Sequence, residues 1–198
     1  MRHLRVLGLL LGALLVVSGC AEAPRSEPLP QTSKYASETT DTRPFGKEVA
    51  SVDAAQSEVG FDLLVPTDTL GSNLENVAIR DKSGNSELSK EQRGVELTWG
   101  DLTIAEAPFA TADEAHAFVD SIADQPTADA YVKRVKVRGQ EGLAWEKGTA
   151  EDKSESGDVN LIELPSSTVI WSEGRVVYRV ASNKASWARL LAVANSMK

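Results

Sequence analysis

Apolar and polar residues alternate along much of the chain after residue 58, which is the pattern of strands with one buried face. The clearest stretch is "VELTWGDLTIAE", where Gly100-Asp101 suits a tight two-residue turn with glycine first. Counting outward from that turn pairs Trp99 with Leu102, Leu97 with Ile104 and Val95 with Glu106, while Thr98 meets Thr103. We therefore predict a hairpin with one largely apolar face and one polar face.

Further strands are predicted from short apolar runs that end at turn residues. They cover residues 60–66, 76–80, 133–138, 142–146 and 159–165, and a second hairpin covers residues 168–182. In that hairpin the alternation places Val169 and Trp171 on the same face as Val176, Tyr178 and Val180. The polar stretch between the predicted strands 142–146 and 159–165, residues 148–158, is predicted to be a loop.

A spacing of three to four residues between apolar positions predicts three helices, over residues 49–58, 111–124 and 184–197. The second helix opens with Thr111 and Glu114 at the spacing of a capping box. Strands that outnumber helices in this way indicate an α+β domain. We expect one domain over residues 45–198, an antiparallel sheet with two or three helices packed on one face.

The N-terminus has the layout of a signal peptide over residues 1–19: basic Arg2 and Arg5, an apolar segment, then the small residues Ser18 and Gly19. The apolar segment is about 12 residues long, whereas a membrane-spanning helix needs about 20. It is therefore not expected to be a permanent transmembrane anchor.

The sequence "VSGC", Val17 to Cys20, resembles the lipobox of bacterial lipoproteins, whose cysteine receives a diacylglyceryl thioether before the peptide is cut in front of it. The resemblance implies that Cys20 is the lipid attachment site, carries acyl chains such as palmitate and fixes the protein to the extracytoplasmic side of the cell membrane. Two or more acyl chains give stable anchoring. Because Cys20 is the only cysteine, the mature chain would have no free thiol and no disulfide. The alternative is an ordinary secretory signal with a chance cysteine near its cleavage site.

Residues 20–44 contain Pro, Ser, Thr and Glu but almost no aliphatic side chains, which is typical of a disordered tether. The alternative is that this segment itself binds a partner. The net charge of the whole chain is −8, and loss of Arg2 and Arg5 with the signal peptide would bring it to −10. An acidic surface argues against nucleic acid as a partner.

Three stretches of the domain, "EVGFDLLVPTDTL", "VELTWGDLTIAEAP" and "VIWSEGRVVYRVASNKASWARLLAVANSMK", resemble an uncharacterised domain family. The family occurs in bacterial envelope lipoproteins and extracytoplasmic sensor proteins, and more distantly resembles the half-barrels of lipoprotein carriers. The resemblance rests on hydrophobic pattern and a few Gly, Pro and Trp positions. It implies a fold, and no catalytic motif comes with it.

Catalytic and metal-binding motifs are not evident in the sequence, so we expect no enzyme, no cofactor and no metal. His116 is the one histidine beyond the signal peptide, and no G-x-S-x-G elbow accompanies it. A stretch with Asp81, Ser83 and Asn85 imitates a calcium loop, but Ser86 and Gln92 stand where glycine and glutamate are needed. The acidic residues Glu151, Asp152, Glu155 and Asp158 are interpreted as a solvated loop.

Two groups of residues are candidates for binding. The four tryptophans, Trp99, Trp145, Trp171 and Trp187, lie on apolar faces of predicted elements and either fill the core or line a groove for an apolar ligand. A basic cluster, Lys133, Arg134, Lys136 and Arg138, either keeps an exposed edge strand from pairing with other strands or contacts an anionic partner such as lipid phosphate.

These observations favour a membrane-anchored lipoprotein that is a non-catalytic accessory, sensing or interaction module of the cell envelope, with an envelope protein or an apolar ligand as partner. The alternative is a carrier for a lipid or another apolar molecule. A third hypothesis is an unrecognised hydrolase, which would need a strained serine in a cleft near His116.

Overall fold

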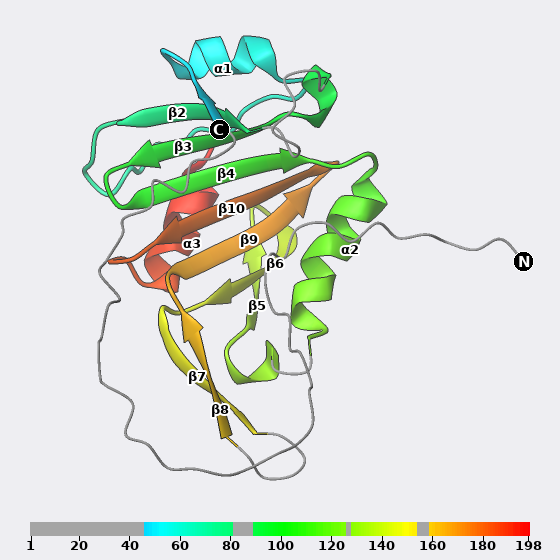
Figure 1. Ribbon diagram of the computed structural model, residues 1–198, viewed down its shortest axis with the longest axis vertical. Helices are drawn as coiled ribbons and strands as arrows, with labels where there is room; N and C mark the ends of the chain where they lie inside the picture. Colours follow the sequence, from blue (N-terminus) through cyan, green and yellow to red (C-terminus); the bar gives the residue numbers. More distant parts are fainter. Residues whose placement is uncertain (1–45, 81–88, 126–127, 154–158) are drawn as a thin grey trace, which may run out of the picture. The chain divides into compact units, whose positions relative to one another are not determined.

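The computed structural model describes residues 46–80, 89–125, 128–153 and 159–198. These described residues form one compact unit. Its architecture is α+β, as predicted: an antiparallel sheet with three helices (Figure 1).

Eight strands form one sheet in which every neighbouring pair is antiparallel. In spatial order they are β1 (Gly46–Glu48), β2 (Asn76–Arg80), β3 (Gly94–Trp99), β4 (Leu102–Pro108), β10 (Val176–Ser182), β9 (Ser167–Glu173), β6 (Gln140–Trp145) and β5 (Lys133–Val137). A separate two-stranded ribbon consists of β7 (Gly148–Lys153) and β8 (Val159–Leu164). The central strands are therefore β3, β4, β10 and β9, and β1 and β5 lie at the edges.

Both predicted hairpins are confirmed in register. Trp99 pairs with Leu102 and Thr98 with Thr103, around a turn in which Gly100 has a φ of 55°. This left-handed conformation at the first turn position is the one that favours glycine. In the second hairpin, Trp171 pairs with Tyr178.

The helices are α1 (Val52–Glu58), α2 (Ala112–Ala123) and α3 (Trp187–Ser196). Each begins after a residue whose hydroxyl accepts a backbone N–H of the first turn: Ser51, Thr111 and Ser186. The first and last helices therefore begin three residues later than predicted. In the first case Val49 is still held at the sheet edge, because its N–H donates to the carbonyl of Val77 at 2.9 Å.

The helices lie on both faces of the sheet. The larger core packs α1 and α3 against one face and includes Leu97, Ile104, Trp171 and Leu190. The smaller core packs α2 against the opposite face, and in Figure 1 α2 lies in front of the sheet while α3 lies behind β9 and β10. Two helices thus share one face as predicted, and the third covers part of the other.

Residues 60–66 were predicted to form a strand, and this prediction is wrong. The segment is extended, but its backbone bonds to other groups: the N–H of Leu64 reaches the carboxyl of Glu106, and Val65 exchanges two hydrogen bonds with Lys198, at 3.0 and 3.1 Å. The segment therefore lies over the larger core as a strap, which we define as residues 61–65.

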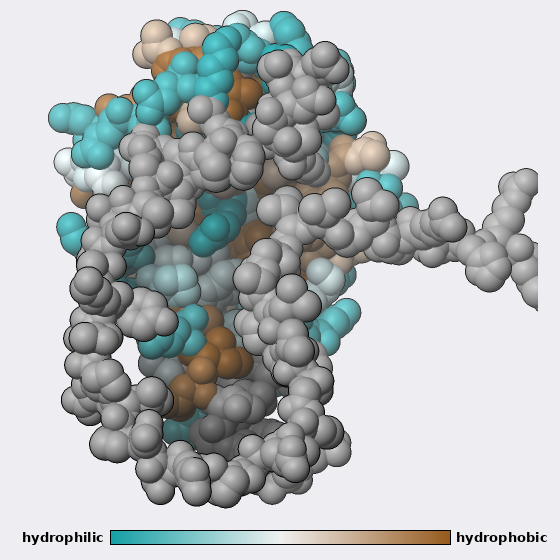
Figure 2. Space-filling model, in the orientation of Figure 1, coloured by the Kyte–Doolittle hydropathy of each residue, from teal (hydrophilic) through white to brown (hydrophobic). Residues whose placement is uncertain are grey.

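The prediction of a polar loop over residues 148–158 is also wrong for residues 148–153, the part that the structure describes. Residues 148–153 form β7, which pairs with β8 from Gly148↔Leu164 to Lys153↔Val159. Polar residues are tolerated here because this ribbon stands apart from the main sheet. Figure 2 shows hydrophobic atoms over the ribbon, where Leu161 is 67% exposed.

Candidate functional site

The four tryptophans do not line one groove. Trp99 and Trp171 are buried in the larger core, where Trp171 stacks on Tyr178 with 5.1 Å between ring centroids. Trp187 packs at the edge of the same core, whereas Trp145 packs against the smaller core on the opposite face of the sheet. The structure therefore divides this candidate site between two faces.

The four basic residues lie on or next to the edge strand β5, and each has a partner. Arg134 lies 3.5 Å from Asp120, Lys136 lies 3.4 Å from Glu141 and Arg138 lies 3.0 Å from Glu173. The ammonium group of Lys133 lies 5.1 Å from the ring centroid of Trp187. The edge position is the one at which charged side chains hinder strand pairing with other chains.

His116 lies exposed on α2, with its Nε2 3.2 Å from Asp120 on the next turn. The non-glycine residues with left-handed backbone are Leu70 and Arg138, so no serine in the described part of the chain shows the strain expected at a nucleophile elbow. Glu151 is exposed on β7. Cys20, residues 20–44, Glu155, Asp158 and the calcium-like Asp81, Ser83 and Asn85 lie outside the described residues.

Within the described ranges, no group of three or more His, Cys, Asp or Glu side chains could hold a metal ion. No helix in these ranges has the length and apolar character needed to cross a bilayer.

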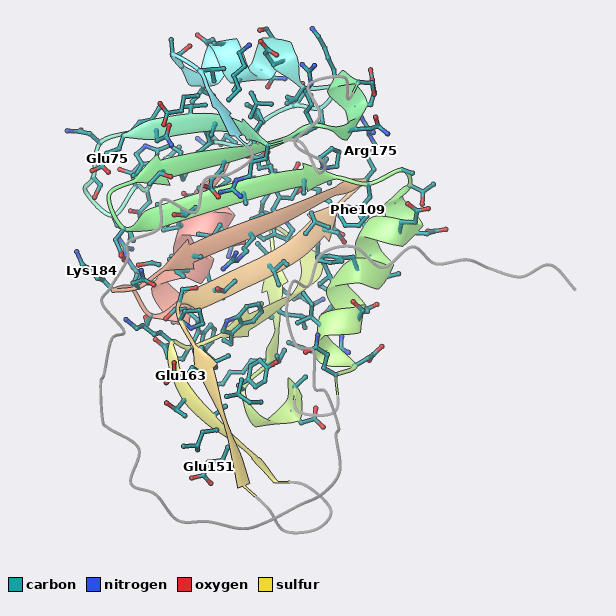
Figure 3. The ribbon with its side chains drawn as sticks, in the orientation of Figure 1. Glu75, Phe109, Glu151, Glu163, Arg175 and Lys184 are labelled. Carbon is teal, nitrogen blue, oxygen red and sulfur yellow. The ribbon has the colours of Figure 1, made fainter. Side chains whose placement is uncertain are left out.

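A polar hollow opens on the sheet face that α2 covers only in part. It has a volume of about 270 Å³. Its lining residues are Glu96, Asp101, Thr103, Ala105, Ser166, Arg179, Ala181, Ser182 and Asn183. In Figure 3, Lys184 is labelled directly after this lining, at the end of β10. Phe109 is labelled at the opposite end of this sheet face, where α2 begins. The hollow exists because residues facing outward here are small: Ala105 on β4 and Ala181 on β10.

Arg179 is the exception in an otherwise buried strand. Every other residue of β10 is buried, and Arg179 is exposed. It pairs across the sheet with Ala105, which in turn pairs with Glu96 on β3. The short alanine side chain thus lies between the guanidinium and the carboxylate. Loss of hydration lowers the pKa of Arg179, and attraction by the nearby Glu96 opposes this.

Two acidic groups of the hollow have partners of their own. Glu96 forms an ion pair with Arg80 at 2.7 Å. Asp101 accepts hydrogen bonds from the hydroxyl of Ser182 and, at 2.8 Å, from the backbone N–H of Lys184. Burial alone would raise the pKa of Asp101, but these hydrogen bonds outweigh it and hold the pKa below its usual value. Asp101 is therefore a fixed anion at the rim.

Glu106 is a buried carboxyl on the opposite face of β4 from Ala105. Its side chain is 1% exposed and accepts the N–H of Leu64 at 3.1 and 3.2 Å. Burial raises its pKa to about 8, although the hydrogen bond from Leu64 acts in the opposite direction. Because it points into the larger core, Glu106 cannot contribute to the hollow.

No family model and no curated protein matches this chain. The site is therefore interpreted from its own chemistry. The hollow was not predicted from the sequence. The available signal was Arg179, a charged residue between Tyr178 and Val180 in a strand whose apolar content indicates a central position. A single charged residue at such a position is informative, because apolar residues are expected there.

Proposed function

We propose that this protein is a membrane-anchored, extracytoplasmic binding module without catalytic activity, which recognises its partner through the polar hollow. The observation that carries the proposal is the hollow itself: a concave, charged site on a sheet face that α2 leaves partly uncovered. Such a site suits polar recognition better than storage of an acyl chain, because ligand sites for apolar molecules are lined mainly by apolar side chains. The placement of His116 as a surface ion-pair residue supports the non-catalytic part.

Membrane attachment through Cys20 is supported by the lipobox-like sequence Val17 to Cys20. We expect Cys20→Ser to abolish lipid attachment, because serine has no thiol to form the thioether. Intact-mass analysis should then lose the diacylglyceryl mass, and the signal peptide should stay attached because cleavage follows lipid transfer. Ser18→Ala is the matched control, since it keeps a small residue beside the cleavage site. A native chain that lacks the diacylglyceryl mass would refute the anchor.

The binding function is tested by native mass spectrometry of the full-length protein, purified from its own host in mild detergent. Ala105→Leu fills the floor of the hollow, and Ala117→Leu, on the exposed side of α2, is the control. We expect a stoichiometric polar compound on the native chain and on Ala117→Leu, but not on Ala105→Leu. A bound lipid other than the one on Cys20 would instead favour the carrier hypothesis. A chain that stays empty after exposure to an extract of envelope metabolites would contradict small-molecule binding.

A further inference from the structure

We propose that the hollow binds a small polar molecule by its carboxylate group, and that Arg179 is the residue that holds this group. The inference rests on the proposed function, in which the hollow is the binding site, and adds the chemical class of the ligand. It follows from the unused donors of Arg179, the local charge, and the size of the hollow.

The guanidinium of Arg179 has unused hydrogen-bond donors. A guanidinium carries five N–H donors and no acceptor, and it stays protonated in proteins. In the described ranges of the chain, the guanidinium of Arg179 makes no hydrogen bond and no ion pair with another residue. It is nevertheless fixed in place, because the backbone of β10 pairs with strands on both sides. A partly dehydrated guanidinium on a rigid strand gains most from a planar anion that accepts two hydrogen bonds at once.

The charge around Arg179 favours an anion. The one nearby carboxylate, Glu96, already pairs with Arg80 at 2.7 Å. Two guanidinium groups therefore share a single carboxylate at this end of the hollow, while Asp101 at the other end of the lining is held by Ser182 and Lys184. A ligand carboxylate at Arg179 would balance the second guanidinium, and Arg80 would keep Glu96 from competing.

The other end of the hollow offers mainly acceptors. Asp101 is held as an anion by Ser182 and by the backbone N–H of Lys184. Asn183 and Ser166 lie in the same lining. These groups suit a hydroxyl or an ammonium on the ligand, at the end away from its carboxylate. The pattern fits amino acids and hydroxy acids better than a molecule with a single charged end.

The volume points to a small ligand. The hollow holds about 270 Å³, just below the roughly 300–1,000 Å³ of sites for drug-sized molecules. A fatty acid also carries a carboxylate, but its acyl chain would lie against polar residues here. We therefore assign a ligand of about the size of an amino acid.

The test is isothermal titration of the full-length protein in mild detergent with two probes, the amino acid L-serine and the hydroxy acid lactate. Lactamide, which has the shape of lactate without its charge, is the uncharged control. We expect saturable binding of at least one probe and none of lactamide. Arg179→Gln should weaken the binding at least tenfold, as expected when a hydrogen-bonded charge pair is lost. Arg179→Lys should weaken it several-fold, because lysine keeps the charge but lacks the planar fork.

The matched control is Arg134→Gln, which removes an arginine that pairs with Asp120 outside the hollow. It should change the affinity less than twofold. The inference is overturned if neither probe binds at tens of millimolar, if Arg179→Gln binds as tightly as the native chain, or if inorganic phosphate binds and both carboxylates do not. Failure of the proposed function would give a different result: the compound found on the native chain would also be found on Ala105→Leu. If Ala105→Leu removes that compound and Arg179→Gln does not, the hollow is the site and the carboxylate assignment alone is wrong.

Discussion

At the scale of single residues, the burial of Glu106 makes the unfolding free energy depend on pH. The carboxyl lies in the larger core and takes the N–H of Leu64 from the strap over residues 61–65. Burial raises its pKa to about 8 from an ordinary value near 4.5. Between these pH values the folded state holds a proton that the unfolded state has released. The unfolding free energy therefore falls as pH rises through this window, by up to about 1.4 kcal/mol per pH unit.

This predicts how Glu106→Gln behaves. The amide is neutral at all pH values, so the variant escapes the cost of ionising a buried carboxyl. Relative to the native chain, its unfolding free energy should rise steadily from about pH 4.5 to pH 8 and level off above pH 8. Urea unfolding at a series of pH values measures the difference. If the two chains differ by the same amount at pH 5 and at pH 8, Glu106 is ionised in the folded state at both values and the prediction fails.

At the scale of elements, the turn between β5 and β6 ties the edge strand to the C-terminal helix. Arg138 and Gly139 both have positive φ, at 52° and 84°, as the mirror-image two-residue turn requires. The N–H of Arg138 donates to the side chain of Asn195 at 2.7 Å, its Nε donates to Glu173 at 3.0 Å, and its guanidinium also donates to the carbonyl of Met197. Arg138 thus joins the turn between β5 and β6 to β9 and to the C-terminal end of α3 from one strained position.

We expect Arg138→Ala to lower the unfolding free energy by about 2–3 kcal/mol, because hydrogen bonds to charged groups each contribute about 1.5–3 kcal/mol. Arg138→Asn loses the same contacts but accepts the left-handed backbone, so it should be about 1 kcal/mol less destabilising than alanine. Urea unfolding compares both with Arg134→Ala on the exposed side of β5, for which a change within about 0.5 kcal/mol is expected. Equal losses for Arg138→Ala and Arg134→Ala would show that the contacts of Arg138 contribute nothing measurable.

Elements defined by local pattern were predictable, and elements defined by distant partners were not. The hairpin around Gly100 followed from alternation and one turn residue, and its register is correct at Trp99↔Leu102. The strap over residues 61–65 has the same apolar content as a strand. Its hydrogen-bond partners, however, are Glu106 and Lys198, far along the chain. Likewise, β7 is polar and pairs only because β8 follows it.

At the scale of the whole molecule, the sheet is a shared middle layer between two cores. In the central strand β10, Tyr178 faces the larger core and its neighbour Val177 faces the smaller one. Sequence alternation could not reveal this, because a strand buried on both faces gives a continuous apolar run. For the same reason, the hollow could not be located beforehand: it depends on where α2 stops covering the sheet, which no local pattern encodes.

The shared sheet predicts that the two cores unfold together. Leu190→Ala on α3 should destabilise the larger core by about 2–5 kcal/mol, and Val119→Ala on α2 should destabilise the smaller core by roughly 2 kcal/mol. Because both helices pack on β9 and β10, each variant should shift one common transition to lower urea concentration with an unchanged slope. Tryptophan fluorescence and far-ultraviolet circular dichroism should trace the same curve. If Val119→Ala instead produced a separate early transition, the layer formed by α2 would fold independently, and the hollow at its edge would open and close without the rest of the sheet.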